Sequence, residues 1–327
     1  MTAPTGQTTF AEDAKTCLTY WDQGTAYSPL ARATRKTVDY PSRVALLMYE
    51  LFEGRIPWAA ETCAPLFRDL DDGLVEWWAQ EHGMTFPFSR LLHRARVMTV
   101  NRGLAPLAIA SLVKHEPQVV PALEAVRTAG HQIALLPCSR APDHLWMTGY
   151  EEPYRAWSKS VRESTRSLSR PVVCEGALTA ALLHDLGWSD APLPLALWVL
   201  EYASQLRAHQ DLTEPVVIQD SSALARRYGR PDLGRRILEA LGIAYVEPLQ
   251  TGQQAVAAAA EYAHVALDEH AAREVASRRY GELVSAGGRT ILALDPYSAA
   301  QLRRVAGDEM RIITLRELIC SPAEPTG

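Results

Sequence analysis

The sequence has little cysteine, no excess of positive charge and no long apolar run. Its five cysteines, at positions 17, 63, 138, 174 and 320, never have the C-x-x-C spacing of a metal or redox pair. The formal net charge is −5, so no general positive field attracts nucleic acid or an anionic membrane. No apolar stretch approaches the roughly 20 residues of a membrane span. Residues 1–16 lack the charged-then-apolar pattern of a signal peptide. We therefore expect a cytoplasmic protein without a membrane span.

Several common catalytic motifs are missing as well. The sequence contains no G-x-G-x-x-G, no P-loop, no H-E-x-x-H and no G-x-S-x-G. It therefore gives no support to a nucleotide-binding, zinc-protease or serine-hydrolase function. The length of 327 residues, with 47% apolar and 22% charged residues, is typical of a globular chain of two or three domains.

Helical periodicity dominates the first hundred residues. Apolar residues recur at helical spacing in three segments, and the third of these ends just before Gly103. The pattern predicts helices over Pro41–Phe52, Asp69–Glu81 and Ser89–Val100. We expect an all-α domain over residues 1–104.

Short apolar runs alternate with amphipathic segments in the rest of the chain. The predicted strands are Pro106–Leu112, Gln132–Leu136, Pro171–Val173, Pro215–Ile218, Ala244–Val246 and Thr290–Leu294. The predicted helices are Val119–Thr128, Tyr154–Leu168, Leu178–Leu186, Leu233–Leu241, His270–Ser285 and Ala299–Ala306. This alternation favours a parallel α/β arrangement.

An internal repeat suggests that the α/β part consists of two related halves. Pro117–Gly130 is similar to Pro231–Gly242, and a predicted strand follows each segment. We expect related α/β repeats over residues 105–208 and 209–327, superposable through a pseudo-two-fold relation. Such halves place a site where strand carboxyl ends meet helix N-termini.

Two segments of the helical region carry a resemblance to a known family. Pro41–Gly54 is similar to an S-P-R-x-R…L-L-E-G helix, and Phe86–Arg96 is similar to G-V-x-Y-x-x-L-I-x-x-A-R. Both motifs occur in the iron–sulfur subunit of glycolate oxidase and the related D subunit of heterodisulfide reductase, which this chain resembles. The resemblance implies a helical ferredoxin-like domain followed by two cysteine-rich repeats, each with C-C-G and C-P-x-C signatures.

The cluster ligands of that family are almost all replaced here. The first cluster motif falls on Cys17, but the other ligand places hold Tyr20, Gln23 and Tyr27. The second motif falls on Asp72, Val75, Trp78 and His82. A 4Fe–4S cluster needs four ligands, normally thiolates, so at most one cysteine per motif is too few. We expect no iron–sulfur cluster and no other cofactor.

The signature positions of the two repeats hold the candidate site residues. In the second half, Gln219–Ser222 stands at the family's H-x-P-C and Asp295–Ser298 at its C-P-x-C. If the family geometry holds, Asp220, Ser222, Asp295 and Tyr297 converge in a vacated cavity. Either aspartate is then a candidate general base and Tyr297 a candidate acid. The alternative is that the cavity has collapsed and these residues serve as caps and turns.

Two cysteines occupy former ligand positions in the first half. Cys138 lies near the C-C-G position and Cys174 at the C-P-x-C position. They are candidates for a residual metal site, with His144, Glu175 or His184 as further donors, or for a reactive thiol. The simpler interpretation is that both are inert remnants.

Two functions follow from the resemblance. The first is a non-redox interaction or scaffold subunit whose partner is a flavin-dependent 2-hydroxy-acid oxidoreductase or another oxidoreductase subunit. The second is an enzyme, for example of specialised metabolism, that uses the vacated cavity for acid–base chemistry on a small molecule. A third possibility is an incomplete cluster that a second chain completes.

Overall fold

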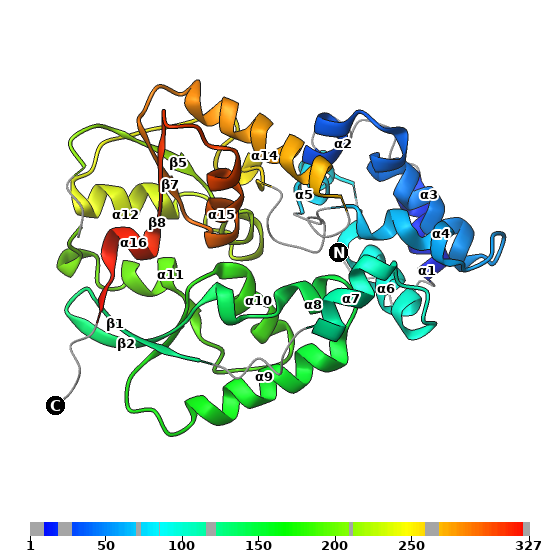
Figure 1. Ribbon diagram of the computed structural model, residues 1–327, viewed down its shortest axis with the longest axis horizontal. Helices are drawn as coiled ribbons and strands as arrows, with labels where there is room; N and C mark the ends of the chain where they lie inside the picture. The colour runs from blue at the N-terminus through cyan, green and yellow to red at the C-terminus, as the bar shows by residue number, and fades with distance from the viewer. Residues whose placement is uncertain are drawn as a thin grey trace.

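The structure, a computed structural model, describes residues 10–18, 28–69, 73–84, 86–115, 122–208, 212–258 and 268–322. It is a mixed α/β protein with a helical part and two sheets (Figure 1). The helical part lies to one side of both sheets, and α14 (Glu269–Val284) extends from the second sheet towards α2 (Pro29–Thr34). None of the helices in the described ranges has the length and apolar character needed to cross a bilayer.

The helical part packs around the apolar stripes expected from the sequence. Met48 of α3 (Pro41–Phe52) and Leu91 of α6 (Phe88–Asn101) are fully buried in its core. The other helical elements here are α1 (Phe10–Leu18), η2 (Thr37–Asp39), α4 (Ala60–Cys63), η3 (Ala64–Phe67), α5 (Leu74–Glu81) and α7 (Leu107–His115). Pro41 at the first turn of α3 and Gly54 (φ +69°) just beyond it explain why both boundaries of this helix are predictable from the sequence.

The first sheet has the strand order β4-β3-β2-β1-β9. Strands β2 (His131–Leu136), β3 (Val172–Cys174) and β4 (Leu193–Pro194) are parallel, whereas β1 (Glu124–Thr128) is antiparallel to both β2 and β9 (Ser321–Pro322). The helical elements that accompany this sheet are η4 (Cys138–Arg140), α8 (Asp143–Met147), α9 (Glu151–Thr165), α10 (Ala177–Asp185), α11 (Leu195–Leu200) and η5 (Ala203–Gln205).

The second sheet is parallel throughout, with the order β6-β5-β7-β8. Its strands are β5 (Val216–Gln219), β6 (Tyr245–Val246), β7 (Thr290–Ala293) and β8 (Arg311–Thr314). Besides α14, the helical elements here are η6 (Ala223–Arg227), α12 (Leu233–Leu241), η7 (Gly252–Gln254), α15 (Pro296–Val305) and α16 (Leu315–Ile319). Each strand of the buried pair β5 and β7 ends at a turn that carries candidate site residues.

Two predicted elements are wrong in type. The segment predicted as a strand over Pro106–Leu112 lies in helix α7, and the segment predicted as a helix over Val119–Thr128 contains strand β1. Ala129 and Gly130 both have positive φ (47° and 76°), which is the geometry of a two-residue hairpin turn between β1 and β2. An apolar pattern over so few residues does not distinguish a helix from a buried strand. The hairpin turn is what makes residues 124–128 a strand.

The hairpin also changes the interpretation of the repeat. Pro231–Gly242 contains α12, but the described part of Pro117–Gly130 forms β1, so these two segments do not share a structure. The two sheets nevertheless add their parallel strands in the same chain order, β2-β3-β4 in one and β5-β7-β8 in the other. The shared strand order is limited to these three strands, and the superposition of the two halves stays a prediction. Strand β9 joins the first sheet although it follows the second.

Candidate functional site

The two sheets bring candidate residues together at the carboxyl ends of β2, β3 and β7. Cys138 follows β2, Cys174 ends β3 and Asp295 follows β7. The packing is close: a Cβ atom added at Gly176 would lie 2.5 Å from the Cys138 sulfur and 4.0 Å from Pro296 Cδ. The first turn of α15, from the second half, therefore contacts the strand ends of the first half.

A buried carboxylate that the sequence analysis missed lies at this junction. Asp143, at the start of α8, has no solvent exposure. Its Oδ2 accepts hydrogen bonds from Thr179 Oγ1 (2.6 Å) and Tyr297 Oη (3.0 Å), and its Oδ1 accepts one from Tyr154 Oη (3.0 Å). Tyr297 belongs to the second half and the other three residues to the first. The Asp143 network, defined by these four residues, thus joins the two halves.

The protonation of this network follows from its burial. Burial raises the pKa of Asp143, and the three hydroxyl donors oppose that rise because they stabilise the ionised form. Burial, together with the neighbouring Asp143, holds the pKa of Tyr297 well above its ordinary value. The Tyr297 hydroxyl therefore stays protonated at neutral pH. Its hydrogen bond goes to the Asp143 carboxylate and not to a ligand.

Asp295 serves as a helix cap, which is the role expected for it if the cavity has collapsed. It is the N-cap of α15 and accepts hydrogen bonds from Tyr297 N (3.0 Å) and Ser298 Oγ (3.2 Å). A carboxylate at an N-cap satisfies orphan backbone donors and interacts favourably with the helix dipole. Whether Asp295 also takes part in catalysis stays a prediction.

Asp220 lies in a different set of contacts. Its carboxylate accepts hydrogen bonds from both terminal nitrogens of Arg235, of which Nη2 is 2.9 Å away. It also accepts hydrogen bonds from Thr251 Oγ1 (2.8 Å) and from the backbone N–H of Gly252 (2.7 Å). These contacts tie the end of β5 to α12 and η7. The partners of Asp220 and Asp295 do not overlap, so the contacts give no sign of a shared carboxylate pair.

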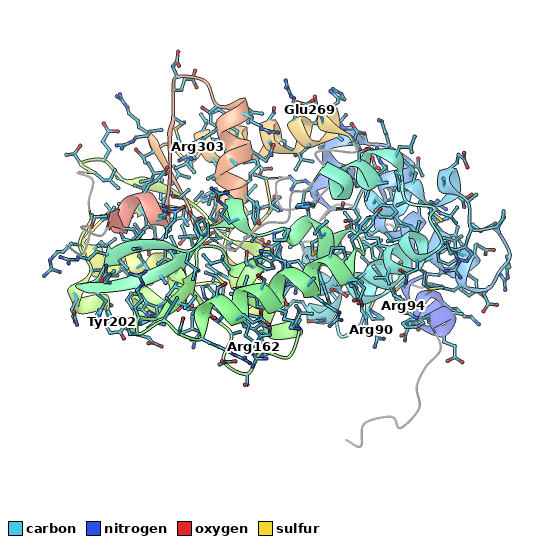
Figure 2. The ribbon with its side chains drawn as sticks, turned by 60° about the horizontal axis from the view of Figure 1, so that its bottom comes forward. Arg90, Arg94, Arg162, Tyr202, Glu269 and Arg303 are labelled. Carbon is cyan, nitrogen blue, oxygen red and sulfur yellow. The ribbon has the colours of Figure 1, made fainter. Side chains whose placement is uncertain are left out.

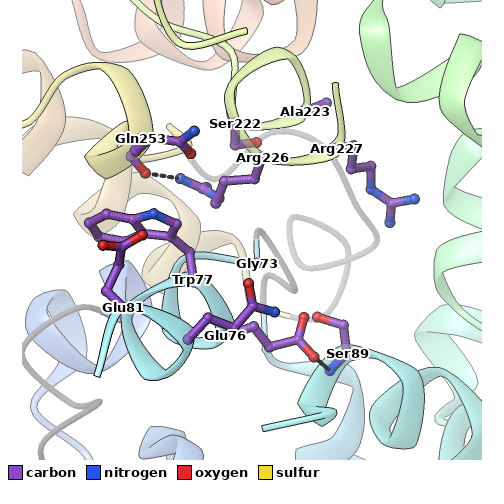
Figure 3. A pocket seen from close by; sticks show the side chains of 11 residues that line it. Gly73, Glu76, Trp77, Glu81, Ser89, Ser222, Ala223, Arg226, Arg227 and Gln253 are labelled. Atoms are coloured by element: carbon purple, nitrogen blue, oxygen red, sulfur yellow. Dashed lines mark hydrogen bonds between the residues drawn. The ribbon is translucent and has the colours of Figure 1, made fainter. Parts of the chain in front are cut away.

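Ser222 has different surroundings from Asp220 and Asp295. It lines a cavity between η6 and the α5 helix of the helical part, together with Trp77 and Arg226 (Figure 3). The four residues predicted to converge therefore have three different sets of contacts: Asp295 and Tyr297 belong to the α15 cap and the Asp143 network, Asp220 to its ion pair with Arg235, and Ser222 to the lining of this cavity.

The two cysteines of the first half are both buried. Burial is the main cause that raises the pKa of each thiol, and Glu175 adds to it at Cys138 and Asp143 at Cys174. Protonated thiols are poor nucleophiles, which argues against a reactive cysteine. Within the described ranges, no three His, Cys, Asp or Glu side chains are grouped so that they could hold a metal ion. A metal bound by Cys138 and Cys174 stays a prediction.

The proposed additional donor Glu175 already has partners. Its Oε2 accepts the backbone N–H of Cys138 at 3.0 Å, and its Oε1 lies 3.8 Å from Arg316 Nη1. It therefore links the loops after β2 and β3 to α16, which gives the side chain a structural explanation.

The positions that align with the family's cluster ligands hold packed side chains where they are described. Cys17 is buried, and burial raises the pKa of its thiol to about 12. Val75 is buried, and the Trp78 and His82 rings lie with centroids 4.1 Å apart. Tyr20, Gln23, Tyr27 and Asp72 lie outside the described residues.

Comparison with known proteins does not extend these observations. No protein-family model matches the chain, and no curated protein or solved structure matches it either. The resemblance to the iron–sulfur subunit of glycolate oxidase therefore rests on the sequence motifs alone.

Asp295→Ala is expected to lower the free energy of unfolding by about 1 kcal/mol, because it removes the cap acceptor of α15. Asp295→Asn keeps an oxygen at the same position, and asparagine is about as good an N-cap as aspartate, so its expected loss is only a few tenths of a kcal/mol. Urea unfolding of the two variants measures both values. A large loss in the Asn variant would contradict the capping role, because it would show that the charge itself is needed.

Proposed function

We propose that this chain is a non-redox interaction or scaffold subunit, built like the iron–sulfur subunit of glycolate oxidase but without its clusters. The observation that carries the proposal is the Asp143 network. It lies at the strand ends where the family signatures fall, and its polar groups are already used by hydrogen bonds within the network, one of which joins the two halves.

The chemistry of the junction supports a structural role. A buried carboxylate with three hydroxyl donors is a satisfied polar network, and such networks make a fold rigid rather than reactive. The thiols at Cys138 and Cys174 are held protonated by burial, whereas a bound cluster needs thiolates. Acid–base chemistry by Asp220, Ser222, Asp295 and Tyr297 needs these groups to converge on one ligand, and their separate contacts favour the scaffold over the enzyme.

The partner class comes from the resemblance. Subunits of that family work beside a flavin-dependent 2-hydroxy-acid dehydrogenase, so a flavoprotein or another oxidoreductase subunit is the proposed partner. The net negative charge of the chain, −5, fits a protein partner better than nucleic acid.

The protein, purified without oxygen, is expected to be colourless and to contain less than one iron per chain, because too few thiolates are available. Metal analysis and a visible spectrum measure this before and after incubation with ferrous iron and sulfide. A broad visible absorbance with roughly four irons per chain would overturn the cluster-free proposal.

The interaction role needs a second measurement. An affinity-tagged chain recovered from its native cells is expected to bring down an oxidoreductase, identified by mass spectrometry and by flavin in the eluate. An eluate that contains the tagged chain alone would contradict the scaffold and favour the enzyme.

A further inference from the structure

A second cavity, which the proposed function does not use, lies beside the edge strand β4 of the first sheet. It has a volume of about 470 Å³, within the usual range of small-molecule sites. Its walls are the end of α9, the start of β3, the segment between α10 and β4, and α11. We call it the β4 pocket. The lining residues that matter below are Arg162, which Figure 2 labels, Arg166, Trp188, Asp190, Leu193 and Trp198.

The aromatic walls of the β4 pocket are held in place by their own contacts. The Trp198 ring is buried, and the His131 ring packs against it edge to face with centroids 5.8 Å apart. The Trp188 ring is also buried, and the Arg162 guanidinium lies 5.3 Å from its centre. Leu193, which lines the same cavity, remains 40% exposed. A preformed apolar surface of this kind binds a flat apolar group at a low cost in conformational entropy.

The charged side chains of the lining leave one positive charge. Arg162 Nη2 lies 3.2 Å from Asp190 Oδ1, so these two residues form an ion pair. Arg166, one helical turn after Arg162, is exposed and has no hydrogen bond or ion pair with another described residue. Glu163 of the same helix does not line the cavity. Two arginines and one aspartate therefore give the lining a net charge of +1, with the Arg166 guanidinium available to a ligand.

The adjacent sheet edge is unsuited to an added peptide strand. β4 is the outermost strand on this side of the first sheet. Pro192 and Pro194 have no backbone N–H, so Leu193 supplies the single donor of residues 192–194. A peptide that extends a sheet needs a row of main-chain hydrogen bonds. The β4 pocket is therefore better suited to a small molecule than to a strand of another chain.

We propose that the β4 pocket binds a small aromatic monocarboxylate. The ring of the ligand would lie against Trp198 and Leu193, because the Arg162 guanidinium already lies over the Trp188 ring. The carboxylate would face Arg166, since one guanidinium pairs well with one carboxylate. The site is independent of the scaffold role, because no residue of the Asp143 network lines it.

The test uses the full chain and three probes that separate the ring from the charge. 3-Phenylpropionate has both, 3-phenylpropanamide has the ring without the charge, and propionate has the charge without the ring. In isothermal titration calorimetry we expect 3-phenylpropionate to bind about tenfold more tightly than either of the other two. No binding of 3-phenylpropionate up to millimolar concentration would overturn the proposal. An equally high affinity for the amide or for propionate would also overturn it.

Two variants at exposed positions assign the walls. Arg166→Gln is expected to weaken the binding of 3-phenylpropionate about tenfold and to leave that of the amide unchanged. Leu193→Asn is expected to weaken both aromatic probes and to leave propionate unchanged, because it removes apolar surface only.

Lys159→Gln is the matched control for the loss of one positive charge. Lys159 is exposed, lies two helical turns before Arg166 on the same face of α9, and does not line the cavity. Its variant should bind 3-phenylpropionate within about twofold of the wild-type affinity. Thermal midpoints of all three variants, expected to equal that of the wild type, show that each is folded. If Arg166→Gln binds 3-phenylpropionate as tightly as Lys159→Gln does, the carboxylate does not pair with Arg166 and the proposal is wrong.

Discussion

Arg96→Met is expected to lower the free energy of unfolding by about 3 kcal/mol, the largest single effect predicted for this protein. The Arg96 side chain is buried, and its three nitrogens donate to the carbonyl oxygens of Leu66 (2.7 Å), Asp69 (2.8 Å) and Met147 (2.9 Å). Methionine fills the space of the aliphatic stem but leaves all three carbonyls without these donors. Each buried carbonyl left unpaired costs on the order of 1 kcal/mol.

Arg94→Met provides the matched control on the same helix. Arg94 is exposed, as Figure 2 shows, and its guanidinium lies 5.2 Å from the centre of the Phe10 ring. The loss of an exposed cation–π contact costs only about 0.5 kcal/mol. Denaturant unfolding of both variants gives the comparison. Equal losses would show that the carbonyl contacts of Arg96 contribute little to the junction between α6 and α8.

Tyr297→Phe is expected to lower the free energy of unfolding by about 2 kcal/mol, the amount typical of a hydrogen bond to a charged group. The change removes only the hydroxyl that joins α15 to Asp143 of the first half. Tyr280→Phe is the control, because the Tyr280 hydroxyl oxygen is buried and has no hydrogen-bond partner among the described residues. Its removal should leave stability unchanged or increase it. A Tyr297→Phe variant as stable as Tyr280→Phe would show that the halves do not depend on the network.

The pH dependence of the same network has a definite sign. Since burial raises the pKa of Asp143 on folding, the folded state holds this proton more tightly than the unfolded chain. The stability that this group contributes is therefore fully present below the unfolded pKa, roughly 3.9, and is lost as pH rises through the folded pKa. Relative to Asp143→Asn, the wild-type protein should gain stability as the pH is lowered through this interval. A difference independent of pH would contradict the raised pKa.

Local sequence patterns predicted the elements whose ends are marked by residues within or next to them. Both ends of α3 and of α12 were predicted, because an apolar stripe, a proline at the start or a glycine at the end marks each of them. Strand β1 was missed because Ala129–Gly130 is equally suited to a helix end and to a hairpin turn. The partner strand β2 decides between the two, and this information is not local.

The candidate site was harder to predict than the fold. Asp295 was found as a helix-start residue, and that is the position it occupies. Asp143 gives no signal in the sequence, because its importance comes from Thr179, Tyr154 and Tyr297, which lie on three other elements. The cavity beside Ser222 likewise depends on the approach of α5 and η6, two segments far apart in the chain. The spacing of residues within one segment cannot predict such contacts between distant segments.

The position of β9 has a consequence for how the chain is made. Arg127 and Val126 of β1 pair with Ser321 and Pro322, so the first sheet receives its outermost strand from the last described residues. An ion pair between Glu124 and Arg316 lies next to this pairing. A ribosome synthesises β1 and β2 long before β9, so the nascent first sheet has an open edge while the second half is being translated. Such edges can pair with other chains, so an additional edge, along β1, is open during translation and is covered only when β9 has been made.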